Sequence, residues 1–230
     1  MPTSTAISSI GDRFRSSAGR FGAPPLRAAR ALVVALTIVA SAFIFASPTL
    51  TDVLQLDRDR LAAGELWRIL TGHVTHWTAE HLAFDLFAFA LLLWLCLERA
   101  VLRTLATLGA AAVVIPTTVL IAHSDMQFYR GLSGLDSALF VLLGTLLLRA
   151  GIQEQRRGLT LTAALALVAF AAKTAFEIAT GGAAFAASGG FVPVPIAHVA
   201  GALVGVIAGL PFADVPVRRR GLLASGGWRG

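Results

Sequence analysis

The chain alternates between long apolar runs and short polar segments that hold most of its arginines. The hydrocarbon core of a membrane is about 30 Å thick, so a helix rising about 1.5 Å per residue needs roughly 20 apolar residues to cross it. Six runs reach or approach that length with at most two charged residues each: 31–47, 81–97, 104–124, 132–148, 158–178 and 192–213. Lipid offers the backbone no hydrogen-bond partners, so each run is predicted to be helical. The predicted fold class is all-α, a polytopic membrane protein with a six-transmembrane-helix bundle.

Composition strengthens this prediction. Of the 230 residues, 56% are apolar and 14% are charged, against roughly 25% charged in a soluble domain. These values exclude a water-soluble fold. The 19 basic and 13 acidic residues give a net charge of +6, which in a soluble protein would suggest nucleic acid. Here the basic residues lie between apolar runs, so we expect the lipid bilayer as a partner and no nucleic acid.

The arginines also predict orientation. Arginine-rich segments at 13–30, 99–103, 149–157 and 218–220 alternate with the segments 49–80, 125–131 and 179–194, which carry no net positive charge. Six spans with both termini in the cytoplasm require this alternation. We therefore predict a disordered basic cytoplasmic N-terminus (1–30), a membrane domain (31–213) and a basic cytoplasmic tail (214–230). The first span could be a cleaved signal sequence, but its leader and apolar core are both long for one.

Polar residues inside the spans are the candidates for chemistry, because a membrane helix excludes them unless something compensates. His81 and Asp85 are four residues apart and so share a helix face. Ser133 precedes Arg149 by 16 residues and His198 precedes Asp214 by 16, about 24 Å along a helix in each case. His81 precedes Glu98 by 17 residues, so His81, Ser133 and His198 are predicted at one depth near the outer face.

A serine and a histidine at one depth can act as a nucleophile and its general base. Gly131 and Gly134 flank the Leu-Ser pair and allow close approach of the backbone, while N–H groups at the start of the span can face a developing oxyanion. His81 could add a donor. Taken singly, each residue is more often structural, a serine bonded to its own helix or a histidine tied to a neighbour.

Three further features have structural interpretations. Trp67 and Trp77 in the segment 49–80 are predicted to be interfacial anchors, with Arg68 solvated nearby. Lys173 and Glu177, four apart, are predicted to be a structural ion pair, with a proton relay as the alternative. Asp136 either tunes the surroundings of Ser133 or complements the helix dipole.

Glycines at four-residue spacing after His198 predict close approach of another helix. Cys96 is the only cysteine, which excludes an intramolecular disulfide. The histidines are scattered and no H-E-x-x-H motif is present, so we expect no metal and no cofactor.

The motifs resemble the rhomboid family of intramembrane serine proteases, over roughly residues 31–213 and in the family's order. The matching strings are Trp67-Arg68, His76 with His81, Gly131-Leu132-Ser133-Gly134, and His198 with Gly201 and Gly205. The lead-in Gly-Glu-Leu-Trp-Arg and the string Gly-Leu-Ser-Gly-Leu-Asp-Ser-Ala are most similar to the rhombosortase branch, whose members are thought to trim C-terminal sorting tails of secreted proteins.

The resemblance implies that Ser133 is the nucleophile and His198 the base. It places His81 and the Ser133 N–H in the oxyanion hole, and it implies a bacterial inner membrane. Asp85 departs from the family pattern, where an asparagine is usual. Either Asp85 is protonated and donates a hydrogen bond, or it orients His81 and leaves the hole to other donors.

The predicted function is that of an intramembrane serine endopeptidase that cleaves membrane-anchored protein segments near the extracytoplasmic face. Two alternatives stay open. A rhomboid-like pseudoprotease would bind membrane clients without cleaving them, and a proton-coupled carrier would use Lys173, Glu177 and Asp85.

Overall fold

A computed structural model of the chain describes residues 24–182 and 194–211. The predicted tail, 214–230, and most of the predicted basic N-terminus, 1–30, lie outside these ranges. Six longer helices form the body of the molecule: α2 (Pro24–Phe45), α6 (Ala79–Arg99), α7 (Val101–Ala122), α8 (Ser133–Gln153), α9 (Arg157–Thr180) and α10 (Pro195–Gly209).

Helices α2, α6, α7, α8 and α9 are long and apolar enough to cross a membrane. Each covers most of one predicted span, which confirms a multi-pass, mainly helical membrane protein. Helix α10 is apolar but has only 15 residues, about 22 Å of helix, so it is shorter than the predicted span 192–213. Its described C-terminal end is held from two neighbours: Arg103 donates to the carbonyls of Ala208 and Leu210, and Arg149 donates to that of Gly209.

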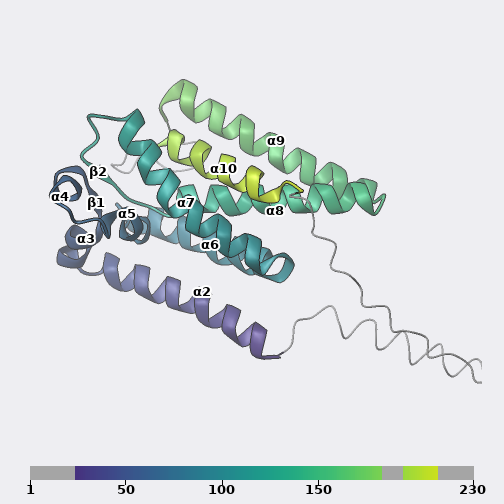
Figure 1. The fold of residues 1–230 in the computed structure, drawn as a ribbon, viewed down its shortest axis with the longest axis horizontal. Helices are drawn as coiled ribbons and strands as arrows, with labels where there is room; N and C mark the ends of the chain where they lie inside the picture. Colours follow the sequence, from purple (N-terminus) through teal and green to yellow (C-terminus); the bar gives the residue numbers. More distant parts are fainter. Residues whose placement is uncertain (1–23, 183–193, 212–230) are drawn as a thin grey trace, which may run out of the picture.

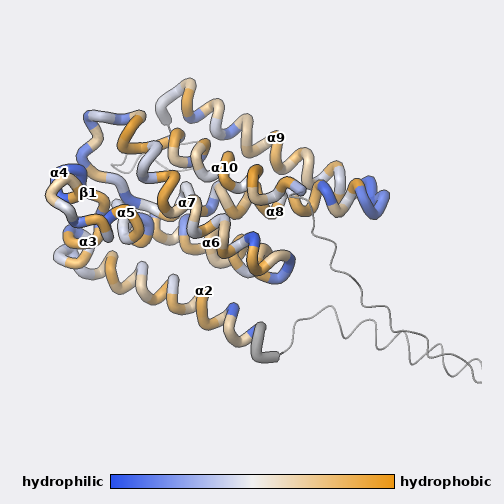
Figure 2. The backbone as a smooth tube through the Cα atoms, viewed as in Figure 1, coloured by the Kyte–Doolittle hydropathy of each residue, from blue (hydrophilic) through white to orange (hydrophobic). Residues whose placement is uncertain are grey.

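The long helices lie side by side along the longest axis of the molecule, and the short elements gather at one end (Figure 1). Helix α8 packs against α6, α7, α9 and α10 and is the most buried of the five long helices, whereas α2 and α9 are the least buried. Hydropathy follows this arrangement, because apolar residues cover the helix shafts and hydrophilic residues concentrate toward the two ends (Figure 2).

Glycines set the closest helix contact, between α10 and α8. A Cβ atom at Gly201 would collide with the carbonyl oxygen of Gly134, and one at Gly205 with that of Ala138. A Cβ atom at Gly209 would lie 2.7 Å from the Thr145 side chain. The predicted small-residue stripe is therefore confirmed, and the helix it admits is α8.

The segment between α2 and α6 is folded rather than a plain connection. Its elements are α3 (Pro48–Leu54), β1 (Leu56–Asp57), α4 (Arg58–Ala62), α5 (Arg68–Thr71) and the 3-10 helix η1 (Gly72–Val74). Strand β1 pairs antiparallel with β2 (Phe128–Tyr129), which directly precedes the turn into α8, so a two-residue ladder supplements the all-α prediction. The ladder ties the first long segment to the start of α8.

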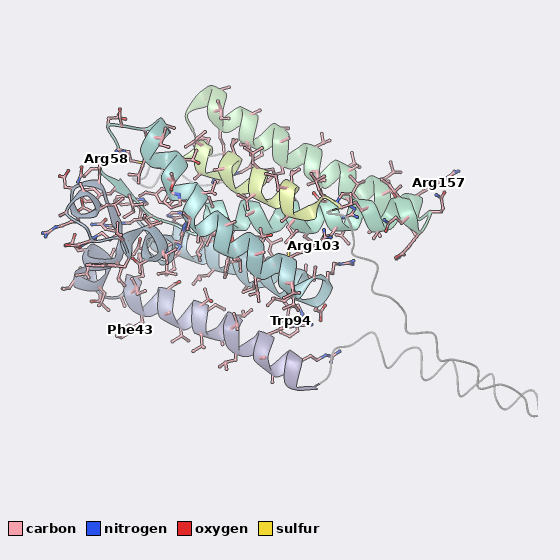
Figure 3. All side chains as sticks on the ribbon, viewed as in Figure 1. Phe43, Arg58, Trp94, Arg103 and Arg157 are labelled. Carbon is pink, nitrogen blue, oxygen red and sulfur yellow. The ribbon has the colours of Figure 1, made fainter. Side chains whose placement is uncertain are left out.

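Arginines fix this end of the bundle. The guanidinium of Arg58 donates to the carbonyls of Leu120, His123 and Met126 and so satisfies the C-terminal end of α7. Arg58 lies at the end with the short elements, while Arg103 and Arg157 lie toward the other end (Figure 3).

The prediction that Arg68 is solvated is wrong. Arg68 is 4% exposed and donates to the carboxylate of Glu65 and to the carbonyls of Asp52 and Gln55. A buried guanidinium needs this many acceptors: α3 and its C-cap supply the carbonyls of Asp52 and Gln55, and Glu65 lies three residues before Arg68.

Candidate active site

The turn before α8 brings the backbone against α6. Gly131 has φ of +123°, a conformation that favours glycine, and its N–H donates to the carbonyl of Gly72 at 3.3 Å. A Cβ atom at Gly131 would lie 2.9 Å from Cε1 and 3.0 Å from Nε2 of His81. Two features therefore require glycine at this position: the positive φ of the backbone and the lack of space for a Cβ atom beside the His81 ring.

One oxygen of Asp85 joins the turn to two histidines. Oδ2 lies 3.2 Å from Nε2 of His76 and 3.2 Å from Nε2 of His81, and it accepts the N–H of Leu132 at 2.9 Å. The predicted shared face of His81 and Asp85 is confirmed. His76 is a second partner of the carboxylate that helical spacing does not indicate, because it lies before α6 begins.

These contacts bear on the two alternatives for Asp85. A backbone N–H can only donate, so Oδ2 acts as an acceptor toward Leu132. Nε2 of His81 lies 3.2 Å from the same oxygen, so a proton on Nε2 would be directed at Asp85. The geometry therefore favours the alternative in which Asp85 orients His81 and leaves the oxyanion to other donors.

Ser133 is the first residue of α8 and is half-buried. Its carbonyl accepts the hydroxyl of Ser137 at 2.8 Å. Leu132 stands at the N-cap position without a side-chain cap, and first-turn N–H groups have no preceding turn to accept them. The start of α8 therefore presents N–H donors beside the Ser133 hydroxyl.

Helix α10 meets α8 beside this serine. A Cβ atom at Gly134 would lie 3.3 Å from the carbonyl oxygen of Ala197, and Gly201 packs against the carbonyl of Gly134. Ser133 precedes Gly134 and His198 follows Ala197 in sequence, so the two candidate residues adjoin a backbone-to-backbone contact. Three of the predicted site residues, His81, Ser133 and His198, thus lie at the N-terminal ends of α6, α8 and α10, with Gly131 and Asp85 between the first two.

The buried histidine of α10 has an acidic partner that sequence reasoning missed. Nδ1 of His198 lies 3.1 Å from Oε2 of Glu177, and the same oxygen lies 2.9 Å from Nζ of Lys173. The predicted Lys173–Glu177 ion pair is therefore confirmed. The four-residue spacing predicts the Lys173–Glu177 pair within α9. It cannot predict the contact of Glu177 with His198, which lies on another helix.

Buried polar groups also lie beneath the short elements. Burial lowers the pKa of His73 from its ordinary value, although Nε2 of His73 lies 3.1 Å from the carbonyl oxygen of Ala112. Burial raises the pKa of Tyr129, and the negative charges of Asp85 and Asp136 raise it further. Asp136 is itself buried in the first turn of α8, which is compatible with either of its predicted roles.

Among residues 24–182 and 194–211, no group of three or more histidine, cysteine, aspartate or glutamate side chains is placed to hold a metal ion. In comparisons with known proteins, no protein-family model matches the chain, and no curated protein matches it either.

Proposed function

We propose that the chain is an intramembrane serine endopeptidase with Ser133 as nucleophile and His198 as general base. The observation that carries this proposal is the contact between the starts of α8 and α10, where Gly134 meets Ala197 and Gly201. Ser133 and His198 are the sequence neighbours of Gly134 and Ala197, so this contact supports a hydroxyl and an imidazole lying near each other at this end of the bundle.

The residues at the starts of α8 and α10, together with Asp85, have separate roles in the proposed reaction. His198 takes the Ser133 proton as the serine oxygen attacks a carbonyl carbon, and it returns that proton to the leaving amine. N–H groups at the start of α8, that of Ser133 among them, face the developing oxyanion. Gly131 gives the backbone room beside His81, and Asp85 holds His81 and the Leu132 N–H in place.

The proposed substrates are membrane-anchored protein segments, among them C-terminal sorting tails. Helical segments hide their carbonyls in internal hydrogen bonds, so the substrate is cut where it is extended or locally unwound. The positive-inside pattern supports a site near the extracytoplasmic face of a bacterial inner membrane, with both termini in the cytoplasm.

The test is cleavage of a co-expressed, tail-anchored substrate together with labelling of the purified protein by a fluorophosphonate probe. Ser133→Ala is expected to abolish both, and His198→Ala to abolish cleavage and slow labelling by about 10²-fold or more. Ser41→Ala, a buried serine on α2, is the matched control and should leave both unchanged. Cleavage that persists in Ser133→Ala would contradict the proposal.

A second variant addresses Asp85 and the pseudoprotease alternative. If Asp85 orients His81 as an ionised acceptor, Asp85→Asn should lower labelling, because the neutral amide oxygen of asparagine accepts from the Leu132 N–H and from His81 more weakly than a carboxylate does. Full or increased labelling would indicate that a neutral donor is needed there. Absence of labelling in folded wild-type protein, with client binding retained, would favour the pseudoprotease.

A further inference from the structure

A buried carboxylate lies against the proposed general base. Glu177 extends from α9, is 2% exposed, and places Oε2 at 3.1 Å from Nδ1 of His198 on α10. His198 is buried as well. Two ionisable groups held together away from water indicate a specific pairing, because either group alone would be costly to bury.

This contact determines which nitrogen of His198 carries a proton. A neutral imidazole has one N–H and one acceptor nitrogen, and a carboxylate at Nδ1 can only accept. The N–H is therefore held at Nδ1, and Nε2 keeps the lone pair. A general base that removes a serine proton through Nε2 needs this tautomer.

Lys173 completes the arrangement. Its Nζ lies 2.9 Å from the same Oε2, so the glutamate is held by a cation on its own helix while it reaches His198. The lysine side chain is 25% exposed and that of Glu177 3%, which places the cation nearer the surface than the carboxylate. Lys173 thus balances the charge of Glu177 and fixes its side chain.

We propose that Glu177 is the positioning residue of a Ser133–His198–Glu177 triad, a proposal that rests on the proposed function. As the serine oxygen bonds to the substrate carbonyl carbon, its proton passes to Nε2, and Glu177 stabilises the resulting imidazolium through Nδ1–H. The proton on Nε2 then passes to the leaving amine as the C–N bond breaks. Water repeats the sequence to release the acyl group, and Glu177 takes up no proton at any step.

The experiment measures the rate of fluorophosphonate labelling of the full chain purified in detergent, together with its thermal unfolding. Glu177→Gln removes the carboxylate but leaves Lys173 unpaired. The double variant Lys173→Met/Glu177→Gln removes both charges and so separates the ion pair from the triad. Glu98→Gln, which removes the acid of the Arg30–Glu98 pair between α2 and α6, is the matched control.

The triad predicts labelling slowed by about 10²-fold in both Glu177→Gln and the double variant. The unfolding temperature, lowered in Glu177→Gln by the unpaired Lys173, should return to the wild-type value in the double variant. Glu177→Asp, which keeps a carboxylate, should label faster than either. A purely structural ion pair predicts instead that the double variant labels at the wild-type rate, and that result would overturn the triad.

The two proposals fail in different ways. If wild-type labelling depends on Ser133 while the double variant labels normally, only the triad is wrong. If Ser133→Ala still labels or cleaves, the protease proposal itself fails, whatever Glu177 does.

Discussion

Gly131 is required by two independent constraints, and a matched glycine separates them. Gly131→Ala should place a Cβ atom against the His81 ring in a backbone conformation unfavourable to alanine, costing about 1–3 kcal/mol of stability and most of the Ser133 labelling. Gly64 also has a positive φ, +97°, but its Cβ position has nothing within 4 Å.

Gly64→Ala is therefore expected to carry the backbone cost alone and to label normally. Thermal unfolding and fluorophosphonate labelling of the two variants measure the difference. Equal labelling in both variants would mean that labelling of Ser133 does not depend on the position of the His81 ring.

His73 should make the stability of the short elements depend on pH. Burial lowers the pKa of His73 in the folded protein from the ordinary 6.5, so the unfolded chain binds a proton at a higher pH than the folded one. Above about pH 6.5, His73 is neutral in both states and does not reduce the free energy of unfolding. As the pH falls below 6.5 toward the lowered pKa of the folded protein, the unfolded chain takes up the proton first and the free energy of unfolding decreases.

His73→Gln removes this titration while keeping a side chain able to donate to the carbonyl of Ala112. The advantage of the wild type over the variant in unfolding temperature, measured in detergent, should shrink from pH 8 to pH 5. Parallel curves over that range would show that His73 is not the group responsible.

At the residue scale, the sequence identifies the candidate site residues better than the residues that they contact. His81 and Asp85 are found together because both lie on one helix face, where a spacing of four is informative. His76 and Glu177 belong to the same clusters, but their contacts join different elements. Arg68 is mistaken for a solvated residue for the same reason, since two of its three acceptors are the carbonyls of Asp52 and Gln55, on and just after a helix that the sequence does not reveal.

At the scale of elements, the contact between α10 and α8 should tolerate no added methyl group. A Cβ atom at Gly205 would collide with the carbonyl oxygen of Ala138 and lie 3.0 Å from the nitrogen of Leu142, and backbone atoms cannot rotate away. Gly205→Ala is expected to cost about 1–3 kcal/mol and to separate the helices that carry Ser133 and His198.

Gly109 on α7 provides the control, because it is exposed and its Cβ position has nothing within 4 Å. Gly109→Ala should be neutral or raise stability by up to about 1 kcal/mol, as alanine favours helix. Thermal unfolding compares the two variants. A Gly205→Ala protein as stable and as active as the Gly109→Ala protein would contradict the close packing.

The apolar runs predict the positions of the long helices, but they do not predict where α10 ends. Helices α6, α7, α8 and α9 each begin or end within a few residues of the predicted spans, because lipid imposes one length on all of them. Helix α10 ends at Gly209 instead, where carbonyls at its end accept from Arg103 and Arg149. The end of α10 depends on arginine side chains of α7 and α8, so the apolar sequence of α10 alone cannot predict it.

At the scale of the whole molecule, the location of the site depends on which end of the bundle faces the cytoplasm. The N-terminal ends of α6, α8 and α10 carry His81, Ser133 and His198, and Arg103 and Arg157 lie toward the other end (Figure 3). If the positive-inside rule holds for this chain, the end with the short elements is extracytoplasmic. The proposed protease would then cut its substrates outside.

Cysteine accessibility tests this orientation in intact cells. Asp125 and Glu154 are exposed at opposite ends of the bundle, and the native Cys96 is fully buried, so it gives a low background. A membrane-impermeant maleimide should label Asp125→Cys directly and Glu154→Cys only after the cells are permeabilised. The reverse pattern would place Ser133 at the cytoplasmic face, and tail-anchored substrates cut from outside would no longer fit the site.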